Sequence, residues 1–129
     1  MHIAITGSSG LVGRTLTSSL GSRGYRVTRV VRGDPGEGEL AWDPSAGHLD
    51  VEPLCDCDAV VHLAGENIAD GRWSQAKKER IRQSRVESTR LLSSALAAAK
   101  TPPRVLITAS AIGYYGDAGD RLLDEQAPA

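Results

Sequence analysis

Thr6-Gly7-Ser8-Ser9-Gly10-Leu11-Val12-Gly13 is the stretch that decides the fold, with glycines at every third position. It follows the small and apolar residues 2–6, a pattern typical of a parallel strand that is covered on both faces. Apolar residues at helical spacing, Val12, Leu16 and Leu20, begin within it. The stretch therefore predicts a tight turn from a buried strand into a helix.

Each glycine of this turn has an expected role beside a phosphate group. Gly7 permits the tight turn, Gly10 lets the backbone approach a pyrophosphate, and Gly13 lets the helix pack closely on the strand. A turn without any ligand is the alternative, but a second strand follows at the spacing of a dinucleotide-binding unit, which favours binding. The predicted cofactor-binding residues of the turn are Gly7, Ser9, Gly10, Leu11, Val12 and Gly13.

The rest of the chain alternates between strand and helix patterns. Helical spacing predicts one helix at residues 11–23 and a second from an N-cap at Ser74 to about residue 100. Apolar runs predict further strands at residues 25–31, 59–64 and 104–109, with a short edge strand at 40–42. This order predicts an α/β fold, a truncated Rossmann-type, doubly wound parallel sheet of about four to five strands with helices on both faces.

The bulk composition fits a single domain of 129 residues, with 40% hydrophobic and 24% charged residues. A net charge of −1 gives no basic footprint, so no nucleic-acid partner is expected. No apolar run is long enough to span a membrane and no signal peptide is recognised, so we expect a cytoplasmic protein. Cys55 and Cys57 are expected to stay reduced, and no metal site is predicted.

The end of the second predicted strand indicates which cofactor is preferred. An acidic residue there would bind the ribose hydroxyls of NAD, whereas an arginine accepts the 2′-phosphate of NADP. The strand ends in Val30-Val31-Arg32, so Arg32 is the predicted phosphate-binding residue. NADP is the expected cofactor and NAD the alternative. A solvated arginine without a ligand is the other interpretation of Arg32.

Three more stretches carry a resemblance to a known family. They are His62-Leu63-Ala64-Gly65-Glu66-Asn67-Ile68, Ser84-Arg85-Val86-Glu87-Ser88-Thr89-Arg90 and Ser110-Ala111-Ile112-Gly113-Tyr114-Tyr115-Gly116. With the glycine loop they resemble the extended short-chain dehydrogenases/reductases, in their atypical epimerase-family, sugar-nucleotide-epimerase-like branch. The resemblance covers essentially the whole chain and a little under half of a typical member. It implies that residues 1–129 are an NAD(P)-binding Rossmann domain whose substrate-binding part is missing.

The resemblance also implies roles for individual residues. Leu63, Ala64 and Gly65 would pass beside the adenosine and ribose of the cofactor, and Asn67 would lie near the nicotinamide. Arg85, beside Ser84 and Ser88 on the long helix, is counted with the cofactor-binding residues. The predicted catalytic residues are Ser110, at the position of the family's catalytic hydroxyl that polarises a carbonyl or alcohol, and Tyr114.

Because of two departures from the family pattern, cofactor binding is predicted more firmly than catalytic turnover. Arg85 stands where related epimerases usually carry asparagine, and the chain contains no Y-x-x-x-K pair for proton transfer. One hypothesis is an NADP-dependent epimerase- or dehydratase-like oxidoreductase acting on a nucleotide sugar or another small carbonyl or alcohol substrate. The others are a non-catalytic dinucleotide-binding sensor and a truncated product without a function of its own. This chain alone is expected to be inactive.

Three expectations concern residues away from the glycine loop. His62 is predicted to be a core histidine with satisfied hydrogen bonds. Residues 77–80, a run of charged side chains, are predicted to form a solvated helix face. The last strand would present an unpaired edge with apolar side chains, which favours a homodimer through that edge.

Overall fold

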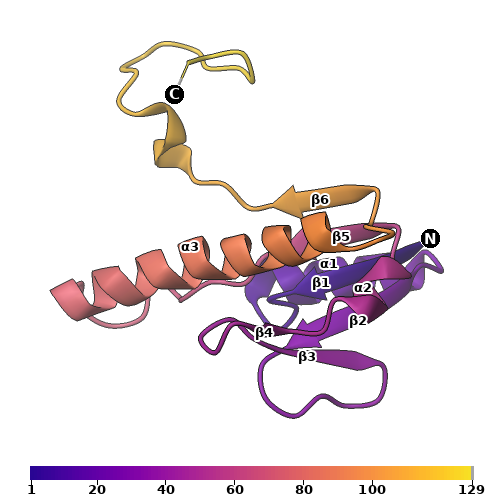
Figure 1. Cartoon of the computed structure of the whole chain (residues 1–129). Helices are drawn as coiled ribbons and strands as arrows, with labels where there is room; N and C mark the ends of the chain where they lie inside the picture. The colour runs from indigo at the N-terminus through magenta and orange to yellow at the C-terminus, as the bar shows by residue number, and fades with distance from the viewer. Residues whose placement is uncertain (129) are drawn as a thin grey trace.

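Six strands form one sheet in the order β4-β3-β2-β1-β5-β6 in the computed structural model, which describes residues 1–128 (Figure 1). The strands are β1 (His2–Thr6), β2 (Arg26–Val31), β3 (Glu39–Asp43), β4 (His48–Leu49), β5 (Ala59–His62) and β6 (Val105–Thr108). All pairs are parallel except the antiparallel β3–β4 pair. The chain moves from β1 to one edge and then to the other, so the switch point at which open α/β sheets bind ligands lies at β1 and β5.

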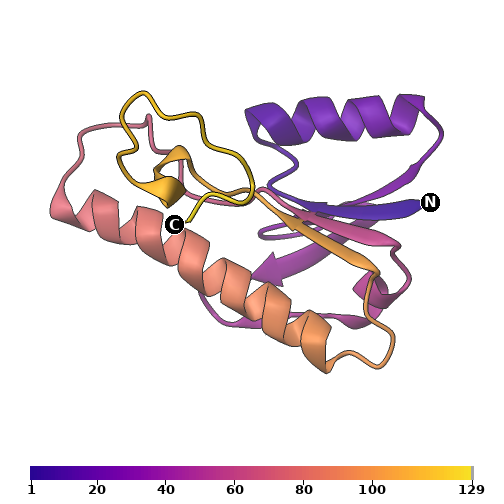
Figure 2. The same cartoon turned by 90° about the horizontal axis from the view of Figure 1, so that it is seen from above.

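Helices lie on both faces of the sheet (Figure 2). They are α1 (Leu11–Ser22), α2 (Glu52–Cys55), α3 (Gln75–Ala98) and the 3₁₀ helix η1 (Ile112–Tyr115). Successive strand residues point to opposite faces, so Ile3 and Ile5 of β1 pack with Leu16 of α1, whereas Ala4 shares a core with Leu92 of α3. The predicted doubly wound architecture is confirmed. Of the helices within residues 1–128, none combines the length and the apolar character that crossing a membrane requires.

The start of β3 is displaced along β2, and this displacement builds one wall of the site. Glu39 pairs with Arg29 and Ala41 with Val31, so Trp42 and Asp43 continue past the end of β2. The Asp43 carboxylate then accepts hydrogen bonds from the Ser45 hydroxyl and the Ala46 amide, which close the turn into β4. The same two hydrogen bonds, with that from Ser45 first, lower the pKa of Asp43.

The predicted elements are found with small shifts at their ends, and the differences have physical reasons. The predicted strand 59–64 ends at His62 because its partner β1 ends at Thr6, where the turn at Gly7 begins. Leu63 N still donates to Thr6 O, but the next amide, Ala64 N, donates to the Thr6 side chain at Oγ1. β4 and α2 were not predicted, so the sheet has six strands rather than four or five, and β4 rather than β3 forms that edge. Of the predicted helical stripe, Leu16 and Leu20 pack against the sheet, whereas the Val12 side chain is 63% exposed.

The opposite edge of the sheet is formed by β6, whose apolar side chains are accessible. Val105, Leu106 and Ile107 are 48%, 37% and 52% exposed. No second strand pairs with β6 within residues 1–128. After β6 the chain leaves the sheet and leads to η1 (Figure 1).

Candidate functional site

An open cleft of about 1360 Å³ lies at the carboxyl ends of β1, β2 and β5. The glycine loop lines one side of it. The other walls are the end of β2, the turn between β3 and β4, the loop after β5 and part of α3. The predicted cofactor-binding residues that line this cleft are Gly7, Ser9, Gly10, Arg32, Leu63, Ala64 and Gly65.

The three glycines of the loop meet different surroundings. Gly7 has a φ of +68°, and a Cβ there would lie 2.6 Å from the backbone carbon of Leu63. A Cβ on Gly13 would lie 2.2 Å from the carbonyl oxygen of Gly7. Gly10 is different, because a Cβ would meet only that same oxygen, at 3.3 Å. Gly7 and Gly13 are therefore needed for packing, whereas at Gly10 the missing side chain keeps space in the cleft.

The start of α1 leaves backbone donors available beside this space. Gly10 is the N-cap residue, no side chain caps the helix, and the first turn carries no acidic residue. Uncapped N–H groups and the positive end of the helix dipole favour an anion. Leu11 and Val12 do not line the cleft, and their side chains are 80% and 63% exposed, so their cofactor-binding roles stay predictions.

Arg29 on β2 and Arg32, which follows this strand, differ in their surroundings. Arg32 is exposed and lines the cleft, and no ion pair of its side chain is found within residues 1–128. Arg29 forms an ion pair with Glu39 at 2.7 Å and donates from Nε to the Ser8 hydroxyl at 3.3 Å. Arg32 is thus the cation of this strand end that is available to a bound anion.

A chain of hydrogen bonds fixes His62 below the cleft. The Ser88 hydroxyl donates to the Ser84 carbonyl, so it accepts from His62 Nε2 at 3.1 Å. His62 Nδ1 is then unprotonated and accepts from the Thr6 hydroxyl at 2.7 Å, which itself accepts from the Ala64 amide at 3.2 Å. His62 is only 4% exposed, and burial lowers its pKa. The prediction of a core histidine with satisfied hydrogen bonds is confirmed.

The buried His62 predicts a loss of stability below neutral pH. The unfolded chain takes up a proton near the ordinary pKa of 6.5, while the folded chain resists it because the pKa of buried His62 is lowered. The His62 contribution is therefore complete above that pKa and declines as the pH falls through it toward the folded-state pKa. We expect the melting temperature of wild type to fall more between pH 7.5 and 5.5 than that of His62→Gln. Parallel pH profiles would contradict this.

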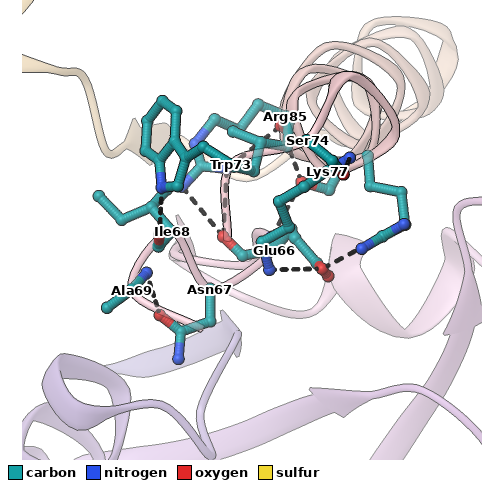
Figure 3. Close-up of polar contacts among 11 residues, drawn as sticks. Glu66, Asn67, Ile68, Ala69, Trp73, Ser74, Lys77 and Arg85 are labelled. Carbon is teal, nitrogen blue, oxygen red and sulfur yellow. Dashed lines mark hydrogen bonds and ion pairs between the residues drawn. The ribbon is translucent and has the colours of Figure 1, made fainter. Parts of the chain in front are cut away.

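Glu66 is held at each of its polar groups (Figure 3). Its amide donates to Ser84 Oγ at 2.8 Å, and its carbonyl accepts from Nη1 and Nη2 of Arg85, both at 3.3 Å. Its carboxylate pairs with Lys77 at 3.0 Å and with Arg80 at 3.5 Å. The hydrogen bond from Lys77 is the main cause that lowers the pKa of Glu66. One residue that lines the cleft thus ties the loop after β5 to α3.

Lys77 corrects the expectation of a solvated face at residues 77–80. Its side chain is only 5% exposed, and its ammonium group pairs with Glu66. The prediction is wrong for Lys77 because Ser74 caps α3 at the Lys77 amide and the loop after β5 folds over this turn of the helix. Arg80, at 58% exposure, does lie at the surface.

Asn67 and Arg85 do not line the cleft. The Asn67 side chain accepts a hydrogen bond from the Ala69 amide at 3.0 Å. The Arg85 guanidinium lies over Gly65, where a Cβ would be 3.3 Å from Cζ, and it also donates to the Ile81 carbonyl. In the structure both side chains hold backbone of the loop after β5 or of α3, and their roles toward a cofactor stay predictions.

Ser110 and Tyr114 also lie outside the cleft. Ser110 follows β6 at the carboxyl end of the sheet and is exposed. Tyr114, on η1, is 60% exposed and packs edge-on against Tyr115 with ring centroids 5.0 Å apart. Their catalytic roles therefore stay predictions.

Several residues of the cleft were not predicted from the sequence. Ser8 lines the cleft, is only 3% exposed, and accepts a hydrogen bond from Arg29. Glu66 lines the cleft from the loop after β5. The turn at residues 43–47 forms a wall of the cleft that was not assigned to the site from the sequence. The position of Glu66 next to the Leu63-Ala64-Gly65 stretch was a signal that could have identified it.

Comparison with known proteins finds a matching family and related proteins. The model of the NAD dependent epimerase/dehydratase family matches residues 3–129. An epimerase family protein of Mycobacterium bovis is 48% identical over 124 residues, which is 95% of this chain and 40% of that protein. This chain therefore spans well under half the length of that curated relative.

Two solved structures share both fold and sequence with this chain. Human epimerase family protein SDR39U1, crystallised with NADPH, is 36% identical with a TM-score of 0.74, and the match covers 89% of this chain and 38% of that one. A nucleoside-diphosphate sugar epimerase from Corynebacterium glutamicum is 40% identical with a TM-score of 0.76, and the match covers 95% of this chain and 25% of that one.

Proposed function

The chain belongs to the NAD dependent epimerase/dehydratase family, and from this premise we propose that its cleft binds a nicotinamide dinucleotide. The observation that carries the proposal is the open space beside Gly10 at the uncapped start of α1. A pyrophosphate fits such a place, because backbone amides can approach it where no side chain intervenes. The human relative crystallised with NADPH supports the same choice of ligand.

The residues that would hold the dinucleotide lie on three walls of the cleft. Gly7, Ser9 and Gly10 would contact the pyrophosphate, and the loop residues Leu63, Ala64 and Gly65 would lie beside the adenosine and ribose. We also assign Asn67 and Arg85 to the cofactor site, where they would act by holding the loop after β5. The residues of the loop are thereby oriented before any ligand arrives.

NADP is the proposed preference because Arg32 is available to a 2′-phosphate at the end of β2. Replacing Arg32 with alanine should weaken NADPH binding about tenfold or more, since a charge-assisted hydrogen bond to phosphate contributes roughly 1.5–3 kcal/mol. Binding of NADH, which lacks that phosphate, should change little. Fluorescence titration of both dinucleotides against the wild-type chain and the variant measures this.

The exposed Arg23, just after α1, offers a matched control. Arg23→Ala removes the same charge far from the cleft and should leave the preference intact. The assignment of Arg32 fails if Arg32→Ala retains the wild-type ratio of the two affinities.

For the longer protein we propose an epimerase- or dehydratase-like oxidoreductase that acts on a nucleotide sugar or another small carbonyl or alcohol. The nicotinamide ring would supply hydride transfer when the cofactor is bound. Ser110 would donate a hydrogen bond to the reacting oxygen, and Tyr114 would lie in the substrate pocket. The nucleoside-diphosphate sugar epimerase among the relatives supports this substrate class.

A dinucleotide-binding sensor without turnover is the second candidate. The exposure of Tyr114 and the position of Ser110 outside the cleft favour it for this chain. We also propose a homodimer through the apolar edge of β6, and a cytoplasmic location in which the free thiols of Cys55 and Cys57 stay reduced.

A further inference from the structure

We propose that Arg29 and Glu39 form a second determinant of cofactor choice, separate from Arg32. Neither residue lines the cleft, but Arg29 pairs with Glu39 and also donates a hydrogen bond to Ser8 of the glycine loop. The inference rests on the proposed binding of a dinucleotide. It concerns the charge that the protein presents to the ribose end of that ligand, where NADPH carries a phosphate and NADH a hydroxyl.

Arg29 connects the sheet to the glycine loop. It pairs in register with Ile5 of β1 on one side and with Glu39 of β3 on the other. Its Nε donates to the Ser8 hydroxyl at 3.3 Å, and Ser8 lines the cleft next to Ser9. The guanidinium therefore places a positive charge one side chain away from the cleft.

Glu39 opposes that charge and also holds the segment that follows Arg32. One carboxylate oxygen pairs with Arg29 Nη1 at 2.7 Å, and the other accepts from the Gly36 amide at 2.9 Å. Gly36 lies in the connection that runs from Arg32 to β3. The Glu39 side chain, which is 17% exposed, thus links Arg29 to the segment that follows Arg32.

The charges of the pair act differently on the two dinucleotides. A ribose phosphate carries about −1.5 to −2 charges near pH 7. Arg29 lies three residues before Arg32, which is about 10 Å along an extended chain. At that separation in water a unit charge changes the binding of a doubly charged phosphate about fourfold, and salt reduces the effect. Arg29 therefore favours NADPH and Glu39 disfavours it, while NADH responds weakly to both.

The experiment measures the ratio of NADH to NADPH dissociation constants for the complete chain, Arg29→Gln and Glu39→Gln. The glutamine at 39 keeps an oxygen for the Gly36 amide, so it removes mainly the charge. We expect the ratio to rise about threefold or more in Glu39→Gln and to fall by a similar factor in Arg29→Gln. Raising the salt concentration should shrink both changes.

Two control variants remove the same charges elsewhere. Arg23→Gln follows α1, and Glu52→Gln lies on α2 before β5, so both stand away from the cleft. The ratio of dissociation constants is used because partial unfolding would weaken the binding of both dinucleotides equally. The inference is overturned if neither test variant shifts the ratio, or if the controls shift it as much. If wild type bound neither dinucleotide, the proposed function itself would be wrong, and this inference with it.

Discussion

Replacing Gly13 with alanine is expected to destabilise the chain by about 3 kcal/mol, the upper end of what overpacking costs. The added Cβ would stand 2.2 Å from the carbonyl oxygen of Gly7 and 2.8 Å from the Cα of Ser8. Both contacts are backbone atoms, so no side-chain rotation relieves them, and α1 must move away from the glycine loop. Urea unfolding followed by circular dichroism measures the change.

Gly21 provides a control in the same helix. A Cβ there meets nothing within 4 Å, and alanine is the better helix former. We expect Gly21→Ala to leave stability unchanged or to raise it by up to about 1 kcal/mol. Equal unfolding curves for Gly13→Ala and Gly21→Ala would show that the close packing of α1 on the loop is not required.

Replacing Gly10 with valine is expected to abolish dinucleotide binding, with a loss of affinity of about a hundredfold or more, because the side chain occupies the place assigned to the pyrophosphate. The fold should survive. Gly10 has φ −72° and ψ 173°, which any residue adopts, and a Cβ meets only the Gly7 oxygen at 3.3 Å. Circular dichroism with an NADPH titration separates the two effects.

Gly10→Ala refines the comparison, because it adds the Cβ alone and should lose less affinity than Gly10→Val. A folded Gly10→Val variant that binds NADPH as wild type does would remove the glycine loop from the proposed site. A variant that fails to fold would show instead that Gly10 is a packing residue like Gly13.

Much of the fold could be predicted because its signals are local. The apolar run before Thr6, the glycine spacing and the N-cap at Ser74 each act within a few residues, and each is found in the structure. β4 has only two residues, too few to show a period. α2 is a single turn, whose signals are Pro53 in its first turn and the Asp50 carboxylate that accepts from the Glu52 amide.

Site residues could be predicted where the local backbone places them, and could not where contacts between distant parts of the chain place them. Gly7 and Arg32 could be placed from their positions at strand ends and Gly10 from its position at the start of a helix, and all three line one cleft. The burial of Lys77 could not, because it depends on Glu66, which is 11 residues away and reaches it through the fold of a loop. The wall at residues 43–47 depends on the displaced start of β3, a matter of strand register that composition does not reveal.

The most direct test of the central claim maps the backbone amide signals of the ¹⁵N-labelled chain while NADPH is added. At 13.6 kDa the chain suits such spectra. We expect saturable shifts that are largest at residues 7–10, 32–33 and 63–66, with little change at Gly24 and Asp58 near the other end of the strands. Binding in the cleft is contradicted if no signal moves at millimolar NADPH, or if the largest shifts fall on β6 and η1 instead.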